Sequence, residues 1–138
     1  MRRDTMNNTE CKLQMLDLYF SEYSFKNSHE DEDVNYNSSF TIKYAINSDD
    51  ESKIKVTIDT NITNSTKTVE LNLQTIGIFK IDKEGIEEKI YDTLMKRNTV
   101  AIIFPFIRSQ ISLLTTQPGM TPIVIPPVNI NALIEEQN

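Results

Sequence analysis

The chain has 138 residues and a mass of 15.9 kDa, which suits one compact domain and excludes a second large one. Apolar residues make up 38 % and charged residues 25 %, with 3 Gly and 5 Pro, so the composition indicates a soluble globular protein and excludes a fibrous or wholly disordered polymer. The net charge of −6, without any basic stripe, disfavours binding to nucleic acid.

The first residues do not form a targeting segment, because Arg2 and Arg3 are followed by polar residues where a signal peptide has an apolar run. The apolar stretch 100–107 is far shorter than the roughly 20 residues that cross a bilayer. The single cysteine, Cys11, closes no intramolecular disulfide and suits a reducing compartment. We therefore expect a cytoplasmic protein that does not insert into a membrane.

The first predicted strand covers residues 13–25, where large apolar and aromatic side chains are dense. Its apolar positions change parity after Phe20, which allows a bulge. The polar and acidic run 27–35 that follows predicts a solvated loop. We expect residues 1–12 to be a flexible N-terminus, 13–134 to form a single domain and 135–138 to be a short tail.

Three further strands are predicted from strict alternation of apolar and polar residues over 40–46, 54–62 and 69–81. Short polar connections make them antiparallel neighbours. The parity of the apolar residues switches around Gly77, where a glycine predicts either a bulge or a close approach of another backbone element.

From Gly85 to Leu114 the apolar residues recur at steps of three and four, which predicts helix. Around Pro105 this helix is apolar on almost all faces, so a two-layer domain alone does not cover it. The proline predicts either a kink or a helix that begins near it.

Four of the five prolines lie in 118–127, which predicts stiff extended backbone carrying Ile123, Val124 and Ile125. Asn129 is placed to cap a last short helix that contains Leu133.

The sequence offers no catalytic or metal-binding constellation. His29, the sole histidine, lies beside acidic residues in a predicted loop and indicates a solvated side chain. The acidic runs 31–33 and 49–51 lack the Gly and terminal Glu of a calcium loop, and no phosphate-binding loop, zinc spacing or nucleophile motif is present. We expect neither an enzyme nor a bound cofactor or metal.

Three blocks, Gln74–Ile81, Ile103–Arg108 and Pro126–Leu133, resemble in order and spacing the SecB family of protein-export chaperones. The resemblance extends over about residues 16–133. It implies an α+β fold in which a four-stranded antiparallel sheet carries a long helix and a short C-terminal helix on one face. It also implies a homotetramer, built as a dimer of dimers, that binds unfolded preproteins without nucleotide.

The resemblance further implies three surfaces. A client groove is expected at the second strand, the crossover before it and the connection between the helices. An oligomer interface is expected on the fourth strand and the long helix. Contact with the translocation motor SecA is expected on the first and fourth strands, where Lys26 and Asn72 replace acidic residues.

The expected client-binding residues are Val34, Tyr36, Phe40, Ile42, Ile123, Val124, Ile125 and Leu133. The expected oligomer-interface residues are Leu71, Leu73, Thr75, Ile103, Phe104, Ile107 and Ile111. The expected SecA-contact residues are Glu22, Glu70 and Asn72.

The sequence is compatible with more than one function. The chain is either a general holdase for unfolded preproteins or a dedicated chaperone of one partner, such as the antitoxin of a toxin-antitoxin system. A third alternative is a small-ligand-binding α+β domain that uses the same apolar groove. The residues assigned to the oligomer interface have their own alternative, which is an ordinary core within one chain.

Overall fold

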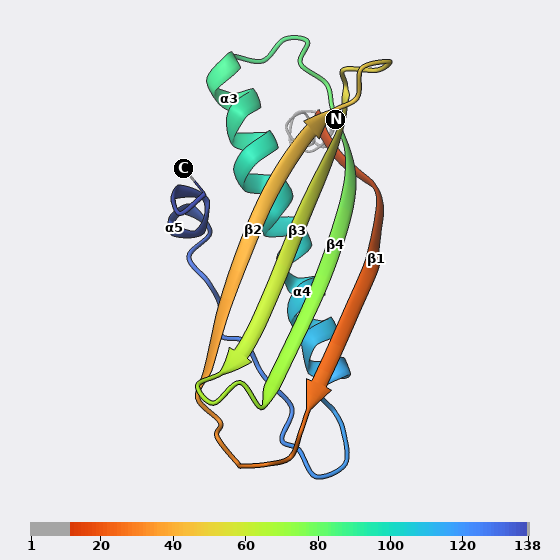
Figure 1. Ribbon diagram of the computed structural model, residues 1–138. Coiled ribbons are helices and arrows are strands. Elements are labelled where there is room, and N and C mark those ends of the chain that lie inside the picture. The colour runs from red at the N-terminus through yellow and green to blue at the C-terminus, as the bar shows by residue number, and fades with distance from the viewer. Residues whose placement is uncertain (1–11, 138) are drawn as a thin grey trace, which may run out of the picture.

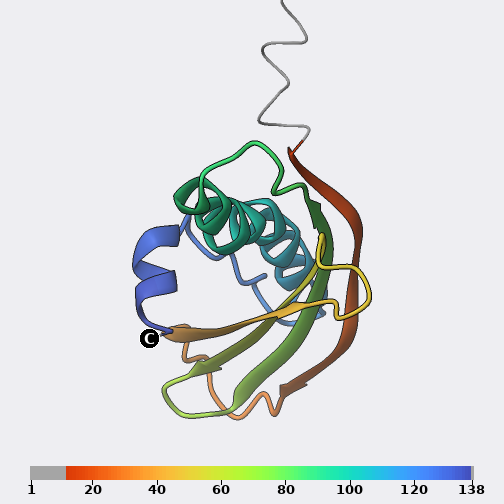
Figure 2. The ribbon, with the colours of Figure 1, turned by 90° about the horizontal axis from the view of Figure 1, so that it is seen from above.

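The structure, a computed structural model, describes residues 12–137. Most of the segment expected to be a flexible N-terminus, 1–12, therefore lies outside the described residues. The described chain forms a four-stranded antiparallel sheet in the order β1-β4-β3-β2. Helices lie against one face of this sheet (Figures 1 and 2). The strands are β1 (Leu13–Asn27), β2 (Tyr36–Ile46), β3 (Lys53–Asn64) and β4 (Val69–Ile81). The helices are α3 (Glu88–Thr93), the π-helical turn η1 (Leu94–Asn98), α4 (Thr99–Leu114) and α5 (Ile130–Glu135).

This architecture confirms the predicted fold class. Alternate side chains of β3 are buried, as the period of two predicts, because one face of the strand packs against the helices. β2 begins at Tyr36 rather than at Phe40, since Tyr36 pairs with Asn64 at the far end of β3. The pairing thus extends a strand into a polar stretch that has no hydrophobic alternation of its own.

The predicted parity switch at Gly77 does not interrupt β4. The register of β4 with β3 is continuous and every odd-numbered residue of β4 is buried, so a bulge in this strand is wrong, although Ile76 on the opposite face is buried as well. The extra residues lie in the partner strand β1, where Leu16 and Ser21 interrupt the register. The other reading expected a close approach of another backbone element, but side chains occupy this space: a Cβ on Gly77 would lie 2.8 Å from Ile103 Cδ1 of α4.

The helical region runs through α3, η1 and α4 without a break in the chain. α4 begins at Thr99 and carries Pro105 inside it, so the proline does not start the helix. The short helix α5 is capped as predicted, because the Asn129 side chain accepts a hydrogen bond of 3.1 Å from the backbone N–H of Ala132.

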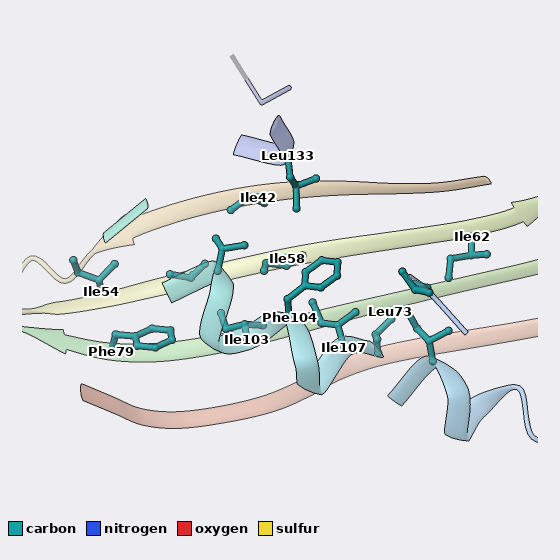
Figure 3. Close-up of a cluster of buried hydrophobic side chains, with 14 of the residues drawn as sticks. Ile42, Ile54, Ile58, Ile62, Leu73, Phe79, Ile103, Phe104, Ile107 and Leu133 are labelled. Atoms are coloured by element: carbon teal, nitrogen blue, oxygen red, sulfur yellow. The ribbon is translucent and has the colours of Figure 1, made fainter. Parts of the chain in front are cut away.

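The hydrophobic core lies between the sheet and α4, and side chains of β2, β3, β4, α4 and α5 meet there (Figure 3). All seven residues expected at an oligomer interface belong to this interior, and none is more than 4 % exposed. Side chains already covered within one chain present no surface to a second copy, so the alternative of an intrachain core accounts for their burial. These residues are Leu71, Leu73, Thr75, Ile103, Phe104, Ile107 and Ile111.

Candidate functional site

An open groove of about 360 Å³ lies at the end of the sheet where the β1–β2 crossover meets the extended segment before α5. Its walls are mainly apolar, and two of its side chains are conspicuously accessible: Val34 is 67 % and Val124 is 72 % exposed. The lining residues are Val34, Tyr36, Ser38, Ile62, Thr121, Pro122, Ile123, Val124, Ile125 and Pro126. An apolar surface held open to solvent in this way is typical of a binding site.

Two polar side chains of α4 and that of Thr115, the C-cap residue of this helix, hold one wall of the groove in place. Arg108 Nε donates to the carbonyl oxygen of Ile125 at 2.9 Å, and Ser112 Oγ donates to that of Ile123 at 3.1 Å. The backbone N–H of Ile123 donates to Thr115 Oγ1 at 2.8 Å. As a result the side chains of Ile123 and Ile125 are buried and that of Val124 is exposed. Sequence reasoning missed these three residues, although polar residues spaced by four and three on an apolar helix were the available signal.

The other wall is tied to the β3–β4 turn through two of the four carboxylates of the crossover loop. Asp31 accepts a hydrogen bond of 3.0 Å from Thr68 Oγ1, and Asp33 accepts one from the Ser65 hydroxyl. The backbone N–H of Asp33 lowers the pKa of Asp31, and the Ser65 hydroxyl lowers the pKa of Asp33. The predicted solvated loop is therefore anchored at the residues that precede Val34.

The structure brings five of the eight expected client-binding residues together as groove lining: Val34, Tyr36, Ile123, Val124 and Ile125. The other three are not among the lining residues, since Phe40 and Ile42 belong to the middle of β2 and Leu133 to α5. Phe40 stacks edge-to-face on Phe104 with ring centroids 5.0 Å apart, and Ile42 packs near Leu133 (Figure 3). Ile42 and Leu133 are buried, so they belong to the core and not to the accessible surface of the groove.

The edge of β2 carries a contact that the sequence did not predict. Gln137, in the segment 135–138 expected to be a tail, donates from Nε2 to the carbonyl oxygen of Phe40 at 2.9 Å. The backbone N–H of Ile42 donates to Gln137 Oε1 at 3.0 Å. Gln137 is therefore attached to the sheet.

The residues expected to contact SecA gather on the face of the sheet opposite the helices, along β1 and β4. Lys26 lies directly across from Glu70 in the strand register, so its positive charge offsets that carboxylate. Asn72 accepts a hydrogen bond of 2.7 Å from Asn61, and Glu22 is exposed on the neighbouring strand. These residues thus share one face of the sheet, and the charge on that face is mixed.

Other reactive groups do not converge. Within residues 12–137, no three or more His, Cys, Asp and Glu side chains are grouped to hold a metal ion. Burial raises the pKa of the Tyr44 hydroxyl to about 12, and this hydroxyl donates to the carbonyl oxygen of Lys96 at 2.7 Å, which is a structural role. No helix in the described part of the chain has the length and apolar character needed to span a bilayer.

Comparison with known proteins identifies the class to which this fold and groove belong. The sequence model of the family described as preprotein translocase subunit SecB matches residues 6–138. This match places the helix-backed antiparallel sheet with its open apolar groove in a class of proteins described by their part in preprotein translocation. The chain belongs to the SecB family.

The chain is also similar to individual curated proteins. The chain is 26 % identical over 129 residues to an uncharacterized protein of Methanocaldococcus jannaschii, an alignment that covers 85 % of this chain and 82 % of that one. It is 32 % identical over 85 residues to the protein-export protein SecB of Neisseria meningitidis, which covers 61 % of this chain and 56 % of that protein. The alignment thus spans little more than half the length of the curated SecB relatives.

A solved structure shares the fold. The SecB-like chaperone Rv1957 of Mycobacterium tuberculosis, determined in complex with a ChAD peptide from the HigA1 antitoxin, matches with a TM-score of 0.69. The match covers 93 % of this chain and 99 % of the other at 13 % identity. The similarity therefore lies in the arrangement of sheet and helices, which the resemblance had implied.

Proposed function

We propose that this chain is an ATP-independent holdase that binds unfolded or non-native polypeptides in the apolar groove, as in SecB-type protein export. The observation that carries the proposal is the groove itself, with its accessible Val34 and Val124 and its buried, rigidly held supports. Apolar attraction is nearly non-directional, so such a groove accepts many unrelated unfolded sequences. Family membership supports the same function.

The test is suppression of aggregation of several unrelated unfolded proteins at stoichiometric ratio and without nucleotide. We expect the wild type to suppress aggregation and Val124→Asp to bind clients about tenfold more weakly or worse, because it places a charge where apolar client side chains pack. Ile90→Asp is the matched control, since Ile90 is an exposed apolar residue on α3 outside the groove. A wild type that protects no client contradicts the proposal.

A second candidate is a dedicated chaperone of one partner, such as an antitoxin. Its support is that the structural neighbour Rv1957 was determined with a peptide from an antitoxin. This function predicts one dominant co-purifying protein from the native host and a toxin-antitoxin gene pair beside its gene. A small ligand in the groove would instead appear as added mass in native mass spectrometry.

We also propose a homotetramer, with contacts made by apolar side chains that remain exposed in the single chain. Leu113 of α4 is 66 % exposed, Tyr23 of β1 is 55 % exposed, and Phe106 and Met15 are also accessible. β1 lies at the edge of the sheet, where strands present unpaired backbone groups. These residues replace the buried ones that sequence reasoning assigned to the interface.

We propose contact with SecA as a second interaction, separate from client binding and weaker. Lys26 opposite Glu70 weakens the acidic surface that would steer the motor, and reversed charge at such a contact lowers the association rate. Client binding does not depend on this patch, because the patch lies on the face of the sheet away from α4 and from the groove. We place the protein in the cytoplasm, where a holdase meets preproteins before export.

A further inference from the structure

The contact between Gln137 and β2 reproduces the hydrogen bonding of a neighbouring strand. β2 is an edge strand, and its pairing with β3 uses only one side of its backbone. The groups that Gln137 contacts, the carbonyl of Phe40 and the N–H of Ile42, are on the opposite side. They flank Thr41, because successive strand residues direct their backbone groups to opposite sides.

This pair of groups is the one that a parallel strand engages. In a parallel ladder one residue donates its N–H to a carbonyl and accepts at its own carbonyl from the N–H two residues further along. The amide of Gln137 supplies the same donor and acceptor, at 2.9 and 3.0 Å. The side-chain amide therefore takes the place of the N–H and C=O of one residue of a parallel strand on this edge.

We propose that the β2 edge at Phe40–Ile42 pairs with the main chain of a bound client, and that Gln137 occupies this edge in the free protein and is displaced on binding. The inference rests on the proposed function and specifies how the client is held. The occupant is an extended polypeptide, because the paired groups are those of a peptide ladder and because the strand leads directly into the apolar groove at Tyr36.

Two features make the displacement feasible. Gln137 lies beyond the last residue of α5, Glu135, so it can move away while the helix stays formed. Its Nε2 also donates to the carbonyl of Leu133 at 3.2 Å, so the amide keeps a partner when it leaves β2. Main-chain pairing reads no side chains, which is compatible with clients of unrelated sequence.

The experiment measures binding of a reduced, carboxymethylated, permanently unfolded protein to the full chain. We expect Gln137→Ala to bind it about threefold to tenfold more tightly than the wild type, since two competing hydrogen bonds are gone. Gln137→Glu should also bind more tightly, because a carboxylate cannot donate to the Phe40 carbonyl. Glu136→Ala is the matched control, because its exposed side chain makes no contact with β2 among the described residues. Thermal melting confirms that each variant is folded.

Amide hydrogen exchange of Ile42 gives a readout that affinity alone does not. This N–H should exchange faster in free Gln137→Ala than in the wild type and become protected again when the client binds. If the variants bind no more tightly and the client leaves the Ile42 amide unprotected, the edge-pairing proposal is overturned while the holdase function stands. If the wild type binds no unfolded protein, the proposed function itself fails.

Discussion

At Gly77 the backbone of β4 passes beneath α4 with no room for even a methyl group. A Cβ there would lie 2.8 Å from both Ile103 Cδ1 and Phe79 Cε1. The glycine therefore sets how closely the helix approaches the sheet. The positions of Ile103 and Phe104 in the core, and through them the support beneath Phe40, depend on this approach.

We predict that Gly77→Ala destabilises the fold by about 1–3 kcal/mol through overpacking. Ile103→Val removes the Cδ1 atom that the new methyl group would meet, at its own cost of about 0.5–1.5 kcal/mol. The double variant should therefore lose less than the sum of the two single losses. Urea denaturation of all three variants measures the coupling free energy between the two positions. Strictly additive losses would show that the contact with Ile103 does not cause the destabilisation by Gly77→Ala.

At the scale of elements, the extended segment 118–127 owes its shape to α4 rather than to its prolines alone. Thr115 is fully buried, accepts from the N–H of Ile123 and donates to the carbonyl of Ile111. Removal of the hydroxyl would leave a buried N–H without a partner. The geometry of the groove wall is thus fixed by a helix that lies behind it.

Thr115→Val keeps the shape of the side chain and removes the hydroxyl. We predict a loss of about 1–3 kcal/mol in stability, faster amide exchange at Ile123 and weaker client binding. Thr116→Val is the control, because Thr116 Oγ1 donates to the carbonyl of Ser112 at an exposed site and does not contact the groove wall. Equal effects of the two substitutions would contradict the anchoring role.

The strands and the cap of α5 could be predicted because local pattern alone determines them. β3 alternates strictly, and Asn129 precedes its helix with the side chain that a cap requires. The bulge of β1 after Phe20 could also be predicted, from the change of parity there. The first residues of β2 and the second bulge of β1, at Leu16, could not, since both depend on the register with a partner strand. The anchors Arg108, Ser112 and Thr115 and the contact of Gln137 likewise join elements that are distant in sequence.

At the scale of the whole molecule, the apolar residues of the sequence do not show which of them form the core of one chain and which form the oligomer interface. Ile103 and Leu113 are both large apolar residues of one helix, yet the first is buried and the second is 66 % exposed. Only the rotation of α4 against the sheet separates them, and hydrophobic content does not encode that rotation when the helix is apolar on most faces.

We predict a tetramer for the wild type by light scattering, and dissociation into smaller folded species for Leu113→Asp, which puts a charge into an apolar contact. Ile90→Asp, on α3, should keep the wild-type mass. Leu73→Asp and Phe104→Asp should unfold the chain instead, because both side chains are buried in its core. A monomeric wild type would contradict the assembly.

The strand order also determines when each part of the sheet can form. β2, β3 and β4 pair with neighbours in sequence, whereas β1 pairs only with β4, as where Leu18 meets Gly77. Contacts of long sequence separation form late, because closing a long loop costs entropy before any pairing is gained. During synthesis β1 is therefore made first and paired last, so this chaperone itself exposes an apolar strand to its neighbours while it is being translated.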